Sequence, residues 1–168
     1  MDAIENILTR RSVRHFGPDP VPEEELQVLL KAAMQAPSAG NTQPWHFVVV
    51  TERALLDKVP EFHSSAEFII EAPLAILICA DENLARPGRW LLDCSAAAEN
   101  MLLAAHARGL GACWIGLHPE PLRIEGAARL FNLPVNVHPL CLIAVGYPVE
   151  RPPNLDRFRP ERVHLNHW

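Results

Sequence analysis

The segment with the clearest chemical character is RRSVRHF, at residues 10–16. Alternate side chains of an extended chain point the same way, so Arg10, Ser12 and Arg14 would share one side. Two guanidinium groups and a hydroxyl on one side form a receptor for a phosphate group. The alternative is that Arg10 and Arg11 only offset the dipole at the end of a preceding helix. That alternative leaves Ser12 and Arg14 unexplained.

A second polar segment, PSAGNTQPWH at residues 37–46, joins a helical stretch to a strand-like one. Several of its side chains can hydrogen-bond: Ser38, Asn41, Thr42 and Gln43. We call residues 37–43 the elbow. Its exposed peptide groups suit a flat ligand with polar edges, and Gly40 permits close approach of the backbone. The alternative is an ordinary turn between a helix and a strand.

The third segment is GLGACWIG, at residues 109–116. It is not a dinucleotide fingerprint, because the next glycine after Gly109 and Gly111 is Gly116 and no helix opens there. It does predict a tight strand end, Trp114-Ile115-Gly116, which could pass closely over a ring.

Other chemistries lack their residues in this sequence. There is no H-E-x-x-H pair for a metal, no G-x-S-x-G motif for a nucleophilic serine and no cysteine with a recognisable base nearby. We therefore expect no metal site and no catalytic side chain. An enzyme without a nucleophile, an acid or a metal needs a cofactor for its chemistry.

The elements that would position these segments alternate along the chain. Hydrophobic periodicity predicts helices at about 2–9, 22–36, 52–59, 88–108 and 120–131, and strands at about 45–51, 73–80, 111–116 and 138–148. This alternation predicts a sheet sandwiched by helices. The 88–108 helix is apolar nearly all round, so we expect it to be covered on most sides.

The composition points to one domain spanning residues 1–168. The net charge of −5 argues against nucleic acid as a partner. No apolar run approaches the ~20 residues of a membrane helix, and the N-terminus has no signal-peptide pattern. Four scattered cysteines in apolar surroundings are typical of reduced core thiols. We therefore expect a cytoplasmic protein that does not enter a membrane.

The last residues, about 149–168, differ from the rest. Their prolines preclude a long helix, yet they carry apolar residues up to Trp168. A disordered tail is one interpretation. The other is an arm laid across a surface, which could belong to a second subunit.

Four segments together carry a resemblance: RRSVRHF, APSAGNTQPWHFVVV, GLGACWIG and the closing ERVHLNHW. In this order, and spanning the chain, they resemble the nitroreductase family of FMN-dependent oxidoreductases. The resemblance implies an α+β fold with a central, mostly antiparallel sheet flanked by helices. It also implies an intertwined homodimer with an extended C-terminal arm and two FMN molecules at the interface.

The resemblance assigns residues to the flavin. Arg10, Ser12 and Arg14 would hold its phosphate and ribityl end, with Arg11 close by and Arg157 and Arg159 of the arm completing the phosphate site. The elbow would line the isoalloxazine ring from the partner subunit, through Pro37, Ser38, Ala39, Gly40, Asn41 and Gln43. Trp114, Ile115 and Gly116 would pack beside the ring, with a backbone N–H directed at its N5 atom.

The implied reaction is ping-pong: NADH or NADPH delivers a hydride to N5, and a nitroaromatic, quinone or free flavin then takes the electrons. The chain is short for the family, and residues 59–88 leave little room for the inserted helices that cover the substrate pocket in longer members. The asparagine often supplied to the flavin from that region has no clear counterpart. The small-molecule acceptor stays open, and a non-catalytic flavin carrier or redox sensor is the alternative.

Overall fold

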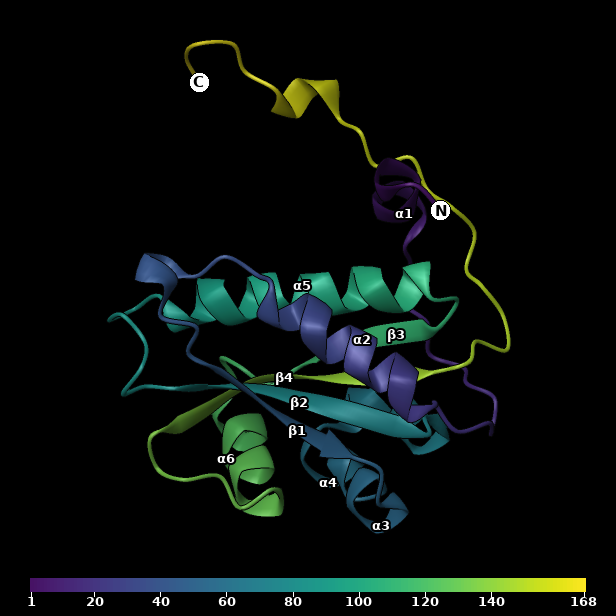
Figure 1. Cartoon of the computed structure of the whole chain (residues 1–168), viewed down its shortest axis with the longest axis vertical. Coiled ribbons are helices and arrows are strands. Elements are labelled where there is room, and N and C mark those ends of the chain that lie inside the picture. The colour runs from purple at the N-terminus through teal and green to yellow at the C-terminus, as the bar shows by residue number, and fades with distance from the viewer.

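The computed structural model describes all 168 residues, and its centre is a four-stranded antiparallel sheet (Figure 1). The strands are β1 (Trp45–Val50), β2 (Leu74–Asp81), β3 (Gly111–Gly116) and β4 (Val137–Gly146), in the order β1-β2-β4-β3. Every neighbouring pair is antiparallel. The predicted α+β class and antiparallel sheet are therefore confirmed.

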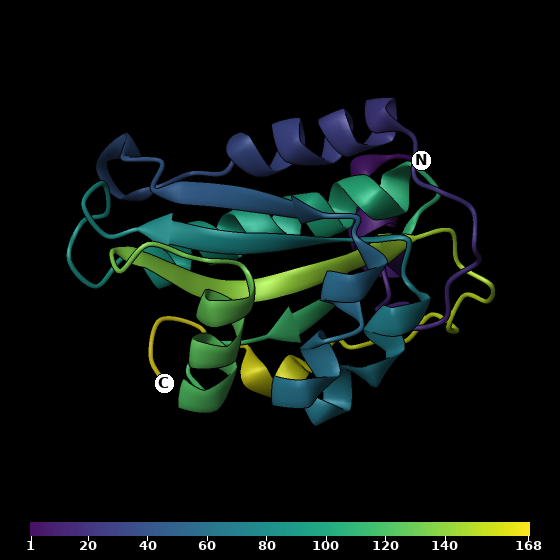
Figure 2. The ribbon, with the colours of Figure 1, turned by 90° about the horizontal axis from the view of Figure 1, so that it is seen from below.

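Helices cover both faces of this sheet (Figures 1 and 2). They are α1 (Ala3–Thr9), α2 (Glu23–Met34), α3 (Arg53–Leu56), α4 (Val59–Phe62), α5 (Trp90–Ala107) and α6 (Pro121–Leu130), with the 3-10 segments η1 (Ala39–Asn41), η2 (Ser64–Glu71) and η3 (Pro160–Arg162). Helices α2 and α5 lie on one face, and α3, α4, η2 and α6 lie on the other. The sheet thus separates two hydrophobic cores.

The strand β2 contributes to both cores by simple alternation. Leu74, Ile76 and Ile78 belong to the core under α2 and α5, and Ala75 and Leu77 belong to the opposite core. Each of these side chains is at most 3% exposed. A strand buried on both faces needs no polar positions, which explains its uninterrupted apolar sequence.

The predicted helix at 52–59 is wrong in extent. Helix α3 ends at Leu56, and a new short helix, α4, begins at Val59 with Pro60 in its first turn. Proline fits a first turn but not a helix interior, because it lacks an N–H and its ring clashes with the preceding turn. The periodicity of the sequence predicted neither α4 nor η2. Residues in or next to these two elements line the cavity described below.

Helix α5 is covered on three sides. Its inner face packs on the sheet core, with Cys94, Ala97 and Met101 fully buried. The Asn100 side chain donates to the Ala32 carbonyl of α2 at 3.1 Å. The Asn6 side chain of α1 donates to the Leu103 carbonyl at 3.0 Å. The expectation that this apolar helix is covered on most sides is confirmed.

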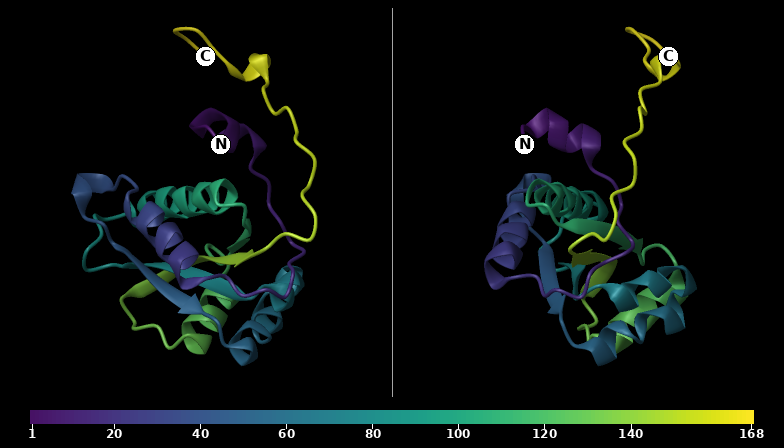
Figure 3. Two further views of the ribbon diagram at one scale, coloured as in Figure 1. Left: turned by 45° about the vertical axis from the view of Figure 1, so that its right-hand side comes forward. Right: turned by 90° about the vertical axis from the view of Figure 1, so that its right-hand side faces the viewer.

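The C-terminal segment 149–168 stands away from the body of the molecule, and helix α1 lies outside α5, which it contacts through Asn6 (Figures 1 and 3). Helix α1 buries none of its residues, and its apolar side chains Ile4, Ile7 and Leu8 are exposed. The C-terminal segment is almost entirely exposed and carries only the short η3.

The four cysteines, Cys79, Cys94, Cys113 and Cys141, are free and buried. Burial raises the pKa of Cys79 to about 11 and, as the largest cause, that of Cys94 to about 12. Such thiols stay protonated and act as small core residues, as predicted. No helix has the length and apolarity needed to cross a membrane, and no cluster of three metal-binding side chains is present.

Candidate functional site

The segment 10–14 runs along the outer edge of β3. Ser12 forms an isolated parallel bridge with Ala112, and the Val13 N–H donates to the Ala112 carbonyl at 3.0 Å. Val13 is 4% exposed and points into the core. In an extended segment its neighbours Ser12 and Arg14 must then point the other way. The alternation predicted from the sequence is the geometry observed.

Arg10, Ser12 and Arg14 all influence the thiol of Cys113. Burial raises the pKa of Cys113, and Arg14, Ser12 and Arg10 each oppose that rise. Arg14 lines a cavity with Cys113, and Arg10 lines a separate cavity. Arg10 is paired with Glu99 of α5 at 3.5 Å, and the guanidinium of Arg14 lies 5.7 Å from the ring centroid of Phe68. Neither arginine is neutralised by a buried carboxylate.

A cavity of about 400 Å³ brings Arg14 together with the end of β3. It is lined by Arg14, His63, Ser65, Ala66, Phe68, Cys113, Trp114, Ile115, Gly116 and Arg123. The predicted strand end Trp114-Ile115-Gly116 thus shares one cavity with the predicted phosphate-side arginine. A Cβ built on Gly116 would meet only Trp114 Nε1, at 3.7 Å, so the backbone there is open to close approach.

The arm contributes to a second cavity of about 620 Å³, between α1 and residues 154–158. Arg10, Arg11 and Arg157 all line it. The structure thus brings Arg157 to Arg10, although almost 150 residues separate them in the chain. Arg159 does not line this cavity, and its guanidinium donates to the neighbouring Phe158 carbonyl at 2.9 Å.

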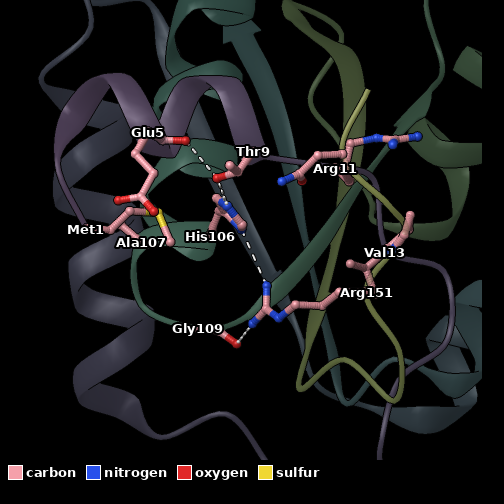
Figure 4. A pocket seen from close by; sticks show the side chains of 11 residues that line it. Met1, Glu5, Thr9, Arg11, Val13, His106, Ala107, Gly109 and Arg151 are labelled. Atoms are coloured by element: carbon pink, nitrogen blue, oxygen red, sulfur yellow. Dashed lines mark hydrogen bonds between the residues drawn. The ribbon is translucent and has the colours of Figure 1, made fainter. Parts of the chain in front are cut away.

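Arg11 also lines a further cavity, of about 440 Å³ (Figure 4). Its guanidinium donates to the Pro153 carbonyl. The buried side chain of Val13 also borders this cavity. In the same cavity Arg151 donates to the Gly109 carbonyl at 2.6 Å. Arg11 therefore anchors the start of the arm; it lines the cavity at Arg157 together with Arg10, but not the cavity that contains Arg14.

The elbow has an unusual backbone. Gly40, Asn41 and Gln43 all have positive φ, of 64°, 56° and 49°. The Ser38 hydroxyl accepts from the Gln43 N–H at 3.0 Å, and the Gln43 amide donates to the Asn41 side chain at 3.0 Å. Positive φ at two non-glycine residues costs free energy, so side-chain hydrogen bonds must help to hold this shape. An ordinary turn between a helix and a strand does not require this strained, hydrogen-bonded backbone.

Within one chain the elbow is separate from the arginine sites. None of Pro37, Ser38, Ala39, Gly40, Asn41 or Gln43 lines the cavity at Gly116 or the cavity at Arg157. The elbow instead sits over the first turn of α5, where the Ala39 N–H donates to the Asp93 carboxylate at 2.9 Å. A single chain does not bring all the predicted ring-binding residues together.

Several residues of the site were not predicted. His63, Ser65, Phe68 and Arg123 line the cavity at Gly116, but they lie in or near the short helices α4, η2 and α6, whose packing the sequence does not reveal. Asp93 carried a usable signal, because it is the single acidic residue between Trp90 and Ala98 of an otherwise apolar helix. A lone carboxylate there is 4% exposed and must have a partner.

The comparisons with known proteins agree with this geometry. The sequence profile of the nitroreductase family matches residues 7–73 and 63–147. A Methanothermobacter thermautotrophicus protein, provisionally named NADH dehydrogenase/NAD(P)H nitroreductase, is 48% identical over 169 residues, covering 100% of this chain and 88% of that protein.

Solved structures show the same fold. An FMN-dependent nitroreductase from Clostridium difficile has a TM-score of 0.91 at 30% identity, over 98% of this chain and 99% of that one. A Desulfovibrio desulfuricans protein solved in complex with FMN, provisionally named a nitroreductase, has a TM-score of 0.86 at 27% identity, over 100% and 99%. With the profile match and a 48% identical relative along its whole length, this chain belongs to the nitroreductase family.

Proposed function

We propose that this chain is an FMN-dependent NAD(P)H oxidoreductase that passes electrons to a small-molecule acceptor of the nitroaromatic, quinone or flavin type. The predicted family, enzyme class and cofactors are confirmed by the relatives, whose names include NAD(P)H nitroreductase and which include a structure with FMN bound. The acceptor, the course of the reaction and the residues of the site are our proposal.

One observation carries the proposal. The cavity that contains Arg14 also contains the end of β3, where the backbone at Gly116 is open to close approach. A cationic side chain next to an accessible backbone edge fits a ligand that is anionic at one end and flat and polar at the other. FMN has this form.

The donor set near Cys113 fits the phosphate end of FMN. Arg10, Ser12 and Arg14 are near enough to Cys113 to affect its pKa, and Arg157 lines the same cavity as Arg10. Guanidinium groups bind phosphate through several parallel hydrogen bonds. Arg10, Ser12, Arg14 and Arg157 would hold the phosphate and the ribityl chain. Arg11, which anchors the arm and lines the same cavity as Arg10 and Arg157, would lie close by, and Arg159 could reach the phosphate by a rotation of its exposed side chain.

The ring end would rest against the backbone of Ile115 and Gly116, with Trp114 beside it. When bound, FMN supplies hydride chemistry, accepting a hydride from NADH or NADPH and releasing the electrons to an acceptor. The chain's own task is to orient the ring and to leave room for the nicotinamide. No side chain of the site has to act as an acid or a base for hydride delivery.

The elbow enters the site through a second copy of the chain. It has a strained, hydrogen-bonded backbone but lies apart from the arginine cavities of its own chain. In a homodimer the elbow of the partner subunit would line the ring. Exposed apolar side chains on α1 and the arm, such as Ile7, Leu8 and Phe158, supply surface that such an association would bury.

The experiment that tests the function is spectroscopic. Purified protein should bind FMN in a ratio of one per chain, absorb in the flavin bands and bleach anaerobically with NADH or NADPH. Colour should return when a quinone or a nitroaromatic compound is added. A protein that does not bind added FMN would overturn the proposal. Yellow protein that neither nucleotide bleaches would favour the non-catalytic carrier instead.

A further inference from the structure

His63 and Asp93 are the two buried polar residues of the chain, and both bind backbone next to the proposed flavin site. Asp93, 4% exposed, accepts from the Ala39 N–H of the elbow. His63, 7% exposed, contacts the Gly116 carbonyl at the end of β3. Burying a polar group is costly unless its partner is well placed, so each contact has to be geometrically good.

The direction of the His63 contact follows from its partners. A carbonyl only accepts, so the Nε2 atom, 2.9 Å from the Gly116 oxygen, must carry the hydrogen. The Nδ1 atom of the neutral ring is then an acceptor, and it lies 3.3 Å from the Ser65 hydroxyl, which can donate to it. Burial lowers the pKa of His63, and the charge of Arg123 lowers it further, so the neutral ring is favoured.

The Gly116–Leu117 peptide is fixed at both of its polar ends. Its oxygen accepts from His63 and also from the Arg123 guanidinium, at 3.3 Å. Its N–H, which belongs to Leu117, donates to the Leu140 carbonyl at 3.1 Å. Glycine has the freest backbone of all residues, so a glycine at a strand end needs such restraints to keep one orientation. Here three hydrogen bonds provide them.

The supports of this peptide come from two elements on the same face of the sheet. His63 follows α4, and its own N–H donates to the Val59 carbonyl at 3.1 Å. Arg123 lies in the first turn of α6. The two helices are packed closely, because a side chain at Gly126 of α6 would collide with Phe62 of α4. The two donors therefore reach Gly116 from a rigid base.

We propose that His63 is a positioning residue, which together with Arg123 fixes the orientation of the Gly116 backbone against the edge of the flavin ring. This inference rests on the proposed function. Through His63 and Arg123, α4 and α6 would then help to set the ratio of the affinities for oxidised and reduced FMN. Ser65 completes the arrangement by holding the imidazole ring in the tautomer that donates to Gly116.

The test compares His63→Leu with His63→Gln. Leucine keeps much of the volume but removes the donor, and the terminal amide of glutamine can reach the place of Nε2 and donate to Gly116. We expect His63→Leu to weaken FMN binding about threefold to tenfold, the effect of one lost hydrogen bond. We also expect it to change the ratio of affinities for oxidised and reduced FMN and to shift the visible circular dichroism of the bound flavin. Glutamine should restore all three.

The midpoint potential provides the sharpest readout. For a two-electron couple, each tenfold change in the affinity ratio moves the potential by about 30 mV. A merely structural His63 would lower the melting temperature while leaving the potential and the flavin spectrum of the folded fraction unchanged, and that result would overturn the inference.

A second pair of variants covers the case in which His63→Leu does not fold. Arg123→Met removes the other donor to Gly116 from a half-buried position, and Arg129→Met is its control on the exposed side of the same helix. Arg123→Met should move the potential and the flavin spectrum in the same direction as His63→Leu, and Arg129→Met should not. If the wild-type protein fails to bind FMN, the proposed function falls and the inference with it. If the wild type binds and bleaches but Arg123→Met and every folded His63 variant match it, the inference alone is wrong.

Discussion

At the scale of single residues, three alternate positions form the proposed anion-binding side of the site. Val13 is buried against the sheet, so Ser12 and Arg14 have to face outward along β3. Arg10 and Arg14 lie near Cys113 without a buried carboxylate to neutralise them. Cations held on an ordered strand edge, with only the exposed Glu99 paired to Arg10, suit a phosphate group.

Replacing either arginine should therefore weaken FMN binding. We expect Arg10→Ala or Arg14→Ala to cost about tenfold to a hundredfold in affinity, since a hydrogen bond to a charged group contributes roughly 1.5–3 kcal/mol. Titration of the apoprotein with FMN measures the effect, and Arg129→Ala, an exposed arginine on α6, is the control. Unchanged affinity in both site variants would remove the phosphate assignment.

Two histidines make the folded state sensitive to acid. Burial, followed by the charge of Arg123, lowers the pKa of His63 below its ordinary value of 6.5. Burial, followed by the charges of Arg151 and Arg10, lowers that of His106. Below pH 6.5 the unfolded chain therefore binds more protons than the folded one, and stability falls as the pH falls through this region.

The expected result is a lower urea midpoint at pH 5.5 than at pH 7.5. Two carboxyl groups also have lowered pKa values, Glu25 through its hydrogen bond to Arg108 and Asp81 through its hydrogen bond to Asn136. They make the stability depend on pH only below about their ordinary pKa values of 4.5 and 3.8. The interval from pH 5.5 to 6.5 thus isolates the histidines. His106→Gln should flatten the pH dependence, and an equally steep profile in that variant would show that His106 does not contribute.

At the scale of elements, the elbow shows how a short connection is given a fixed shape. It joins α2 to β1 through three residues of positive φ, and Asp93 in the first turn of α5 holds the Ala39 N–H. A β-carbon at Gly40 would require the exposed guanidinium of Arg86 to move, and the φ of 64° there strains any residue other than glycine. The elbow is therefore specified by local hydrogen bonds and by its contact with α5.

Gly40→Val tests whether this shape serves the flavin. A branched residue at φ of 64° is strained, and it blocks close approach to the backbone. We expect a loss of FMN affinity that exceeds the loss of folding stability, both measured against wild type by titration and by urea unfolding. Gly88→Val, at a φ of 70° with open space around it, is a matched control for the strain alone. A Gly40 variant that unfolds early yet binds FMN fully when folded would make the elbow a simple turn.

At the scale of the whole molecule, α1 and the arm project from the body with their apolar residues uncovered (Figure 3). Phe158, Leu165 and Trp168 are each more than two thirds exposed. Hydrogen bonds tie the arm to the body only near its start, where Arg11 donates to Pro153 and Arg151 donates to Gly109; Figure 4 shows the Arg151 contact. Beyond that point no hydrogen bond joins the arm to the body, which fits the proposed association with a second subunit.

Removal of residues 149–168 should consequently weaken both dimerisation and flavin binding. It deletes Arg157 from the cavity at Arg10 and removes the exposed apolar anchors. Sedimentation of the truncated protein measures association, and flavin absorbance per chain measures occupancy. Arg157→Ala in the full-length chain separates the two effects, because it should reduce flavin affinity while the dimer persists. A full-length monomer that holds FMN stoichiometrically would contradict the two-chain site.

The sequence by itself determined the elements and the alternation of the arginine segment. Periodicity located the long helices and all four strands to within one or two residues, because each buries a long, regular apolar pattern. It located neither α4 nor η2, where prolines and short turns leave no such pattern. The side chains of Arg10, Ser12 and Arg14 also predicted a phosphate site, because their chemistry and their alternate spacing can be read from one short segment.

Only the tertiary structure decided which of these residues meet. The approach of Arg157 to Arg10, the separation of Arg11 from Arg14, and the binding of Gly116 by His63 and Arg123 all depend on packing between distant segments. The burial of His63 could not be recognised beforehand for the same reason, whereas Asp93 stands out in the sequence as the single acidic residue at the start of an apolar helix. A polar side chain becomes costly only when other segments exclude water from it, and the fold alone determines where that happens.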